Sequence, residues 1–209
     1  METISINQNM ETISDCQSEE AMVQVKPLRA DARRNRDALI SKGREIFADG
    51  DEGVRFDDFA GLAGVGTGTL YRHFPTREAL AAAVYEEEVA TLCNLARELR
   101  DTLPAGEALK AMLRLMVDHI DADHTLARRL AILLAAAPEE MVRGGLALEQ
   151  AVAELVADGV GAAVVRDDVP AGAVMMALHG IGAAHDRPEW RAEADGVITL
   201  VIDGLARRP

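Results

Sequence analysis

Two short helical segments joined by a glycine-bounded turn, between residues 56 and 74, constrain the fold more than any other stretch of this chain. The apolar residues of the first segment recur at the i, i+3, i+4 and i+7 spacing of one helix face: Phe56, Phe59, Ala60 and Ala63. The turn Gly64-Val65-Gly66 then ends this helix. In the second segment Leu70 and Phe74 lie four residues apart and so share a face. Two short helices with such a turn predict a helix-turn-helix.

The outer face of the second segment carries groups that suit contact with nucleic acid. It holds Thr67, Gly68, Thr69, Tyr71 and Arg72, and His73 lies near its boundary. Hydroxyl, guanidinium and imidazole groups donate hydrogen bonds to phosphates and to base edges in a major groove. The second segment is therefore predicted to enter the major groove of double-stranded DNA. The alternative is that these residues are ordinary solvated surface, and the surrounding motif argues against it.

The charge distribution agrees with this prediction although the total charge does not. The formal net charge is −13, which by itself argues against a nucleic-acid partner. Residues 1–25 have five acidic residues and no basic one, and residues 78–209 have twenty-two acidic and twelve basic residues. Residues 26–77, which contain the helix-turn-helix, have ten basic and eight acidic residues. The one segment that is not acidic is the one predicted to bind DNA.

The rest of the chain predicts helices and no sheet. Only seven residues are aromatic, and no stretch alternates apolar and polar residues as a half-buried strand does. We expect an all-α protein of about nine helices. A three-helix helix-turn-helix domain is expected over residues 28–85, and a helical ligand-binding and dimerisation domain over residues 86–209. Residues 1–27 are polar and are expected to form a disordered tail.

Capping residues, glycines and prolines predict where the other helices begin and end. The expected ranges are 31–49, 77–99, 107–121, 125–136, 138–158, about 170–184 and about 188–207. Asp31 and Thr76 are the predicted N-caps of the first two. Gly159 and Gly161 are expected to close the helix over residues 138–158.

The segment from Leu28 to about Tyr85 closely resembles the DNA-binding domain of the TetR/AcrR family of transcriptional regulators. Four strings carry the resemblance: Phe56-Asp57-Asp58-Phe59-Ala60, Ala63-Gly64-Val65-Gly66, Gly68-Thr69-Leu70-Tyr71-Arg72-His73-Phe74-Pro75 and Arg77-Glu78-Ala79-Leu80. The opening residues 28–36 look like the start of a branch whose carboxy-terminal half is called SbtR-like.

The resemblance implies roles for the matched positions. Thr67, Gly68 and Thr69 match positions that approach base edges and phosphates in the family. Tyr71 and His73 match positions that usually touch the DNA backbone.

Four arginines extend this implied surface. Arg77 replaces the usual lysine and is expected to reach a phosphate, and Arg33 and Arg34 would add phosphate contacts. Arg55 stands where the family commonly has a Ser or Thr N-cap. Arginine cannot accept the N-cap hydrogen bond, but it can bind phosphate directly. Thr67 stands where lysine is frequent, so we expect fewer ionic contacts and a shallower salt dependence than is usual in the family.

The resemblance implies a homodimeric, ligand-responsive transcriptional regulator, most often a repressor, that binds a palindromic operator. Its effector would be an unidentified small molecule. The alternative is a helical small-molecule-binding or scaffold protein without operator binding. The negative net charge of the chain and the threonine at position 67 are compatible with this alternative. No phosphate-binding Gly-Lys-Ser/Thr string and no Gly-x-Ser-x-Gly string is present, so we expect no enzyme and no cofactor. Without a signal peptide or a long apolar run, the chain is expected to be cytoplasmic, with no membrane partner.

Methionines and histidines of the second domain are candidate lining for an effector pocket, because methionine adapts to varied apolar ligands. The candidates are Met112, Met116, His119, Met175, Met176 and His179, with Trp190 beside them. The alternative is that each belongs to the ordinary core. No metal site is predicted, because His119 and His124 are five residues apart and do not share a helix face. Cys16 and Cys93 have no metal-ligand or disulfide spacing.

The last two helices, residues 170–184 and 188–207, are the predicted dimer contact, as two pairs packed into four helices. Glycines would let the backbones approach, at Gly172, Gly180 and Gly182. Apolar area would come from Val197, Leu200, Val201 and Leu205. Because glycines in a helix cost about 1 kcal/mol each relative to alanine, close packing against a partner is the expected offset.

Overall fold

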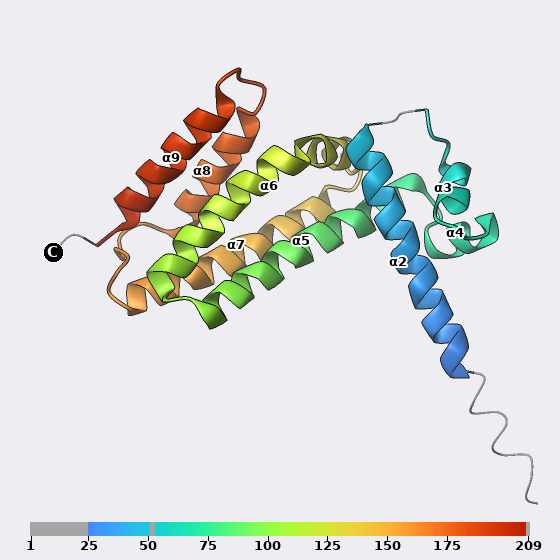
Figure 1. Ribbon diagram of the computed structural model, residues 1–209, viewed down its shortest axis with the longest axis horizontal. Helices are drawn as coiled ribbons and strands as arrows, with labels where there is room; N and C mark the ends of the chain where they lie inside the picture. Colours follow the sequence, from blue (N-terminus) through green and yellow to red (C-terminus); the bar gives the residue numbers. More distant parts are fainter. Residues whose placement is uncertain (1–24, 51–52, 208–209) are drawn as a thin grey trace, which may run out of the picture.

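The computed structural model describes residues 25–50 and 53–207, so most of the predicted tail lies outside the described residues. These residues form an all-α structure, which confirms the predicted fold class (Figure 1). The described part has eight helices: α2 (Val25–Asp49), α3 (Phe56–Leu62), α4 (Thr67–His73), α5 (Arg77–Thr102), α6 (Ala105–Leu133), α7 (Pro138–Gly161), α8 (Ala171–Ala183) and α9 (Trp190–Leu205). None of these helices is long and apolar enough to span a lipid bilayer.

The helices form an elongated arrangement with the short helices at one end (Figure 1). There α3 and α4 lie beside α2, and α8 and α9 lie side by side at the opposite end. Between the two ends run α5, α6 and α7. The helix-turn-helix is therefore far from the last two helices, and any communication between the ends has to pass through α5, α6 or α7.

Two hydrophobic cores hold this arrangement together, and α6 belongs to both. The core around the helix-turn-helix buries Leu39, Phe47, Phe59, Leu70, Phe74, Leu80, Val84, Leu126, Leu130 and Leu134. The other core buries Leu109, Met112, Leu113, Val117, Val152, Leu155, Val174, Leu178, Trp190 and Ile198. The second half of α6 contributes Leu126 and Leu130 to the core around the helix-turn-helix. The first half contributes residues such as Leu109 and Val117 to the other core. The two regions are therefore joined by a shared helix rather than by an exposed linker.

The two helices expected over residues 107–121 and 125–136 are the two parts of α6. The expected break falls at a kink: Asp123 has non-helical angles, φ −115° and ψ 19°, and the helix continues beyond it. Apolar residues on both sides of the bend are buried, in different cores. The kink at Asp123 therefore lies between the α6 residues of one core and those of the other.

The end of α7 also differs from expectation. The helix continues to Gly161, and the left-handed residue that follows is Ala163, with φ 58°, rather than a glycine. Gly159 lies inside the helix, where a Cβ atom would come within 2.5 Å of Cγ2 of Val165. The absence of a side chain at Gly159 therefore allows Val165 of the following loop to pack against α7. The backbone N–H of Arg166 donates to the carbonyl of Leu205 at 2.9 Å, which joins that loop to the end of α9.

The first described helix begins earlier than predicted, at Val25 instead of Asp31. Pro27 is its third residue. A proline is tolerated in the first turn of a helix because the backbone N–H groups there have no acceptor within the helix. Thr76 is the N-cap of α5 as predicted, and its hydroxyl accepts a 3.1 Å hydrogen bond from the backbone of Ala79.

Candidate nucleic-acid interface and internal cavities

A tight turn fixes α3 and α4 relative to each other. Gly64 adopts φ +70°, a left-handed conformation that glycine adopts without steric cost. The backbone N–H of Val65 donates to the carbonyl of Ala60 at 2.9 Å, so the turn folds back on α3. No side chain caps α3 at Arg55, as expected, but the Asp58 carboxylate accepts a 3.2 Å hydrogen bond from the Arg55 backbone. Backbone hydrogen bonds and the Asp58 carboxylate thus fix the turn and the start of α3.

The buried face of α4 leaves the predicted contact residues outside. Leu70 is fully buried, and it anchors the helix between α2 and α3. Thr67, Gly68, Tyr71 and Arg72 are exposed, whereas Thr69 and His73 are half-buried. Apart from its chain neighbours and the backbone of its own helix, no described atom lies within 4 Å of a Cβ built on Gly68. The first turn of α4 can therefore approach a flat surface closely.

Tyr71 has a partner that the sequence did not reveal. Its hydroxyl donates a 2.6 Å hydrogen bond to Oδ1 of Asp57 on α3, and its ring meets the Phe56 ring edge-on at 5.6 Å. The hydrogen bond to Asp57 raises the pKa of the Tyr71 hydroxyl above its ordinary value. A phosphate would compete with Asp57 for this donor.

Arg77 has partners inside the protein instead of a free guanidinium. Its Nη1 donates to the carbonyl of Val54 at 2.9 Å. The guanidinium carbon lies 5.5 Å from the ring centre of Phe47 and 5.2 Å from that of Phe59. The sequence predicted that Arg77 reaches a phosphate. In the structure its guanidinium instead connects α5 to Val54 before α3 and to the rings of Phe47 and Phe59. The two rings and the carbonyl attract the guanidinium because they offer π faces and an acceptor.

The remaining predicted basic residues are exposed. Arg33 and Arg34 lie on α2, where Arg34 pairs with Asp31 in the same helix. Arg55 is exposed, and its Nη2 lies 3.8 Å from Oδ2 of Asp57. Asp57 thus faces both Arg55 and Tyr71, which gives the predicted DNA-facing surface one carboxylate among its donors.

An apolar cavity of about 220 Å³ lies between α5, α6, α7 and α8. It includes four of the six predicted lining residues, namely Met116, His119, Met175 and His179. Met112 is instead fully buried in the core beside it. Met176 is 75% exposed, because it lies about 100° around the axis of α8 from the buried Met175. These two predictions were wrong.

One wall of this cavity is polar and connects three helices. Arg44 of α2 donates from Nε to Oε1 of Glu88 at 2.6 Å and from Nη2 to Oδ1 of Asp123 at 2.7 Å. On the other side, Nδ1 of His119 lies 3.2 Å from Oδ2 of Asp123, and its Nε2 lies 4.0 Å from Oε2 of Glu88. Residues of α2, α5 and α6 therefore meet in one ion-paired network. Their separations in sequence, 44 and 79 residues, explain why no local pattern predicted it.

His119 and His124 belong to two separate groups of potential metal ligands. Glu88, His119 and Asp123 have potential ligand atoms within 4.8 Å of one another, and so do His124, His185 and Asp186. The two rings of the second group, His124 and His185, are stacked at 3.6 Å. His119 and His124 are thus kept apart, as their spacing predicted.

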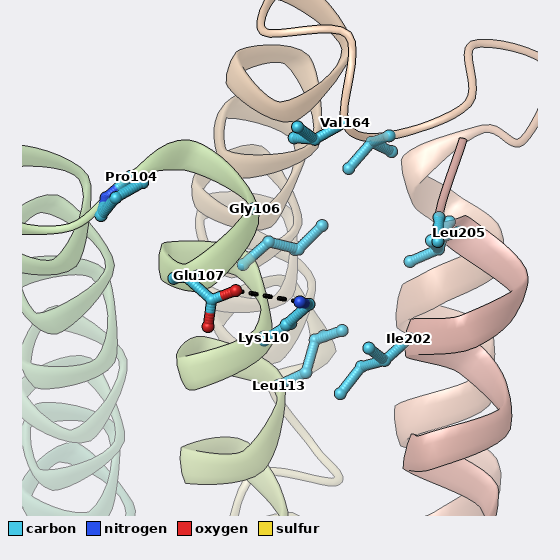
Figure 2. Close-up of a pocket in the computed structure, with 11 residues that line it drawn as sticks. Pro104, Gly106, Glu107, Lys110, Leu113, Val164, Ile202 and Leu205 are labelled. Carbon is cyan, nitrogen blue, oxygen red and sulfur yellow. Dashed lines mark hydrogen bonds and ion pairs between the residues drawn. The ribbon is translucent and has the colours of Figure 1, made fainter. Parts of the chain in front are cut away.

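A second cavity, of about 210 Å³, lies between the start of α6, the end of α9 and the loop after α7 (Figure 2). Figure 2 shows Leu113 of α6, Ile202 and Leu205 of α9, and Val164 of the preceding loop around it. Lys110 and Glu107 form a 2.9 Å ion pair within one turn of α6. Leu205 is therefore buried within the single chain. The prediction that it belongs to the dimer contact was wrong.

The exposed side of α8 and α9 includes apolar side chains and part of the predicted dimer contact. Leu200 is 73% exposed, Val197 is exposed, and a Cβ on Gly180 would meet no atom within 4 Å. Other predicted members turn inward. A Cβ on Gly172 would lie 3.3 Å from Glu149, one on Gly182 would lie 3.9 Å from Ile120, and Val201 is half-buried against the core. Helix periodicity divides these residues between two faces, which the sequence prediction had merged.

Comparisons with known proteins agree on one family. Residues 39–84 match the family of bacterial regulatory proteins called tetR, and residues 104–207 match the C-terminal domain of SbtR-like transcriptional regulators. A TetR transcriptional regulator from Streptomyces coelicolor is 34% identical, with 83% of this chain and 99% of that one covered and a TM-score of 0.67. A TetR regulator from Mycobacterium vanbaalenii is 35% identical, with 86% and 99% covered and a TM-score of 0.64.

A further relative is similar over a shorter stretch of the chain. An HTH-type transcriptional regulator from Staphylococcus aureus is 32% identical over 63 residues, which are 29% of this chain. The match spans about a third of that curated relative, 33% of its length.

Proposed function

The chain belongs to the TetR family of transcriptional regulators, and on that premise we propose that it is a repressor that binds a palindromic operator as a homodimer and releases it when a small molecule binds. The observation that carries the proposal is the exposed face of α4. Its hydroxyl and guanidinium groups stand outside while Leu70 holds the helix against the core. Such a face suits contact with base edges and phosphates.

Homodimerisation is supported by the outer face of α8 and α9. Leu200, Val197 and Met176 expose apolar side chains there, and Gly180 leaves room for a second backbone. Two copies joined at this face would present two α4 helices to successive major grooves, about 34 Å apart. One copy alone has one reading helix, so dimerisation and operator affinity are coupled in this proposal.

Ligand response is supported by the cavity between α5, α6, α7 and α8. Two of these helices, α5 and α6, also supply the core of the helix-turn-helix. A ligand that binds better to the released conformation would shift the protein away from the DNA-bound one. A coupling of about 1–3 kcal/mol changes operator affinity roughly five- to hundredfold.

The proposal is tested by a fluorescence anisotropy titration against the DNA upstream of the gene, with a shuffled sequence as the control. We expect the upstream fragment to bind at least about a thousandfold more tightly than the shuffled one. Thr67→Ala should change the preference among fragments with altered half-sites, because a base contact carries sequence information. Equal affinity for upstream and shuffled DNA would favour a small-molecule-binding protein without operator binding.

A further inference from the structure

We propose that the effector has an apolar body and a protonated amine or amidinium head, and that this head binds Glu88 and Asp123 in competition with Arg44. The inference rests on the proposed function, since it specifies the chemistry of the cavity that would take the effector. It is drawn from the charges that line the cavity and from the position of Arg44 on the other side of the same carboxylates.

The first observation is the sign of the charge in the cavity. Its charged lining residues in the described structure are both carboxylates, Glu88 and Asp123, and their side chains are only 16% and 19% exposed. The other polar lining residues are Tyr85, His119 and His179. A carboxylate shielded from water needs a cation or several donors nearby. An anionic head would meet like charge here, whereas a cationic one would meet its complement.

The second observation is that the two carboxylates share a single guanidinium. Arg44 donates hydrogen bonds to Oε1 of Glu88 and Oδ1 of Asp123. The other two carboxylate oxygens, Oε2 and Oδ2, face the ring nitrogens of His119. The group thus has two carboxylates and one guanidinium. A second cation placed near Oε2 and Oδ2 would balance it.

The third observation is that this group separates two cavities. Glu88, His119 and Asp123 line the apolar cavity and also a cavity of about 310 Å³ on the side of α2. Arg44 lines only the second of these, together with Ile40 and Ser41 of α2. A ligand head and Arg44 therefore approach the same carboxylates from opposite sides.

This geometry gives the ligand a direct route to the helix-turn-helix. The Arg44 contacts tie α2 to α5 and to Asp123, the residue at which α6 bends. A cation that draws the two carboxylates into the apolar cavity weakens their hold on Arg44. Because α2 packs against α3 and α4, its release changes the position of the reading helices.

The test uses three probes with one skeleton and three heads: 4-phenylbutylamine, 4-phenylbutanol and 4-phenylbutyrate. Their binding to the full chain is measured by isothermal titration calorimetry. We expect the amine to bind about tenfold more tightly than the alcohol or the carboxylate, the size of one charge-assisted hydrogen bond. Glu88→Gln should remove this preference and leave the affinity for the alcohol within about twofold. The matched control is Glu87→Gln, whose carboxylate is exposed and does not line the apolar cavity.

Competition is tested with Arg44→Met, which keeps an apolar stem and removes the charge. The amine should bind this variant about tenfold more tightly than wild type, because its competitor is gone. Equal affinity of the amine for wild type and Arg44→Met, equal binding of the three probes, or no amine binding to either protein would overturn the proposal. Binding of Zn²⁺ alone that Glu88→Gln abolishes would also overturn it, in favour of a metal site.

The operator titration separates this proposal from the proposed function. If the amine pattern fails while upstream DNA binds specifically, the effector class is wrong and the regulator remains. If the amine pattern holds while no specific DNA binding occurs, the cation site stands and the operator function falls.

Discussion

The hydroxyl of Tyr71 on α4 donates a 2.6 Å hydrogen bond to the carboxylate of Asp57 on α3, so the predicted DNA-facing surface carries an internal acceptor for one of its own donors. In the free protein this bond fixes the orientation of the tyrosine. On DNA, a phosphate would have to replace Asp57 or share the donor with it. The pair therefore sets how much the Tyr71 hydroxyl contributes to DNA affinity.

Tyr71→Phe should weaken operator binding about fivefold, because it removes one phosphate donor worth about 1 kcal/mol. Asp57→Asn should instead tighten binding at low salt, since it removes a negative charge from the surface that faces the phosphates, and this gain should fade at high salt. Anisotropy titrations at two salt concentrations measure both effects. Unchanged affinity in the Tyr71→Phe protein would show that the hydroxyl stays with Asp57 on DNA.

Arg77→Ala should lower the free energy of unfolding by about 2 kcal/mol, because it removes a charged hydrogen bond and the contacts with two aromatic rings. The slope of log K against log salt should stay as in wild type, since the guanidinium is bound to the carbonyl of Val54. Urea denaturation and a salt series measure the two quantities.

The control for Arg77 is Arg72→Ala, at an exposed position on α4. It should leave the stability unchanged and reduce the salt slope by about 0.9, as expected for the loss of one phosphate contact. If Arg77→Ala reduced the slope of log K against log salt and left the free energy of unfolding unchanged, Arg77 would be a phosphate contact and not a structural residue.

Leu200→Glu should give a folded monomer with little operator affinity. Leu200 is 73% exposed in the single chain, so a charge there does not disturb the core, but it would be buried in the proposed dimer. Sedimentation velocity measures the mass, and Ile132→Glu, at another exposed apolar position, is the control. A Leu200→Glu protein that stays dimeric would locate the interface elsewhere.

Two adjacent glycines of α7 should respond differently to the same substitution. Gly145→Ala should raise the stability by up to about 1 kcal/mol, because alanine favours helix and no atom lies within 4 Å of its Cβ. Gly144→Ala should be less stable than Gly145→Ala by about 1 kcal/mol or more. Its Cβ would lie 2.5 Å from the ring of Tyr85, whose hydroxyl donates to the carbonyl of Met141 at 3.1 Å. Thermal unfolding of the two variants measures the difference, and equal stabilities would show that Tyr85 moves away without cost.

Local features of this chain were predictable from sequence. Gly64 and the spacing of Phe59, Leu70 and Phe74 determine α3, the turn and α4 within nineteen residues, and the structure has them as expected. The position of Pro138 likewise marks the start of α7. These signals depend on backbone conformation and on residues close in sequence, which a single chain reveals.

Features that depend on distant partners were not predictable. The bonds from Arg44 to Glu88 and Asp123 leave no periodic signal, and the inward position of Arg77 depends on rings contributed by α2 and α3. The sequence of α8 is apolar on most of its surface, so its periodicity could not distinguish the cavity-lining Met175 from the exposed Met176. Its two faces became distinct only once the neighbouring helices were in place.

Hydroxyl-radical footprinting of the wild-type protein on its upstream DNA tests most directly whether two copies read one operator through α4. We predict two protected stretches related by a dyad, on one face of the duplex, with centres about 34 Å or one helical turn apart. The Leu200→Glu protein should lose both together. A single protected stretch, or equal protection along a shuffled sequence, would contradict the account.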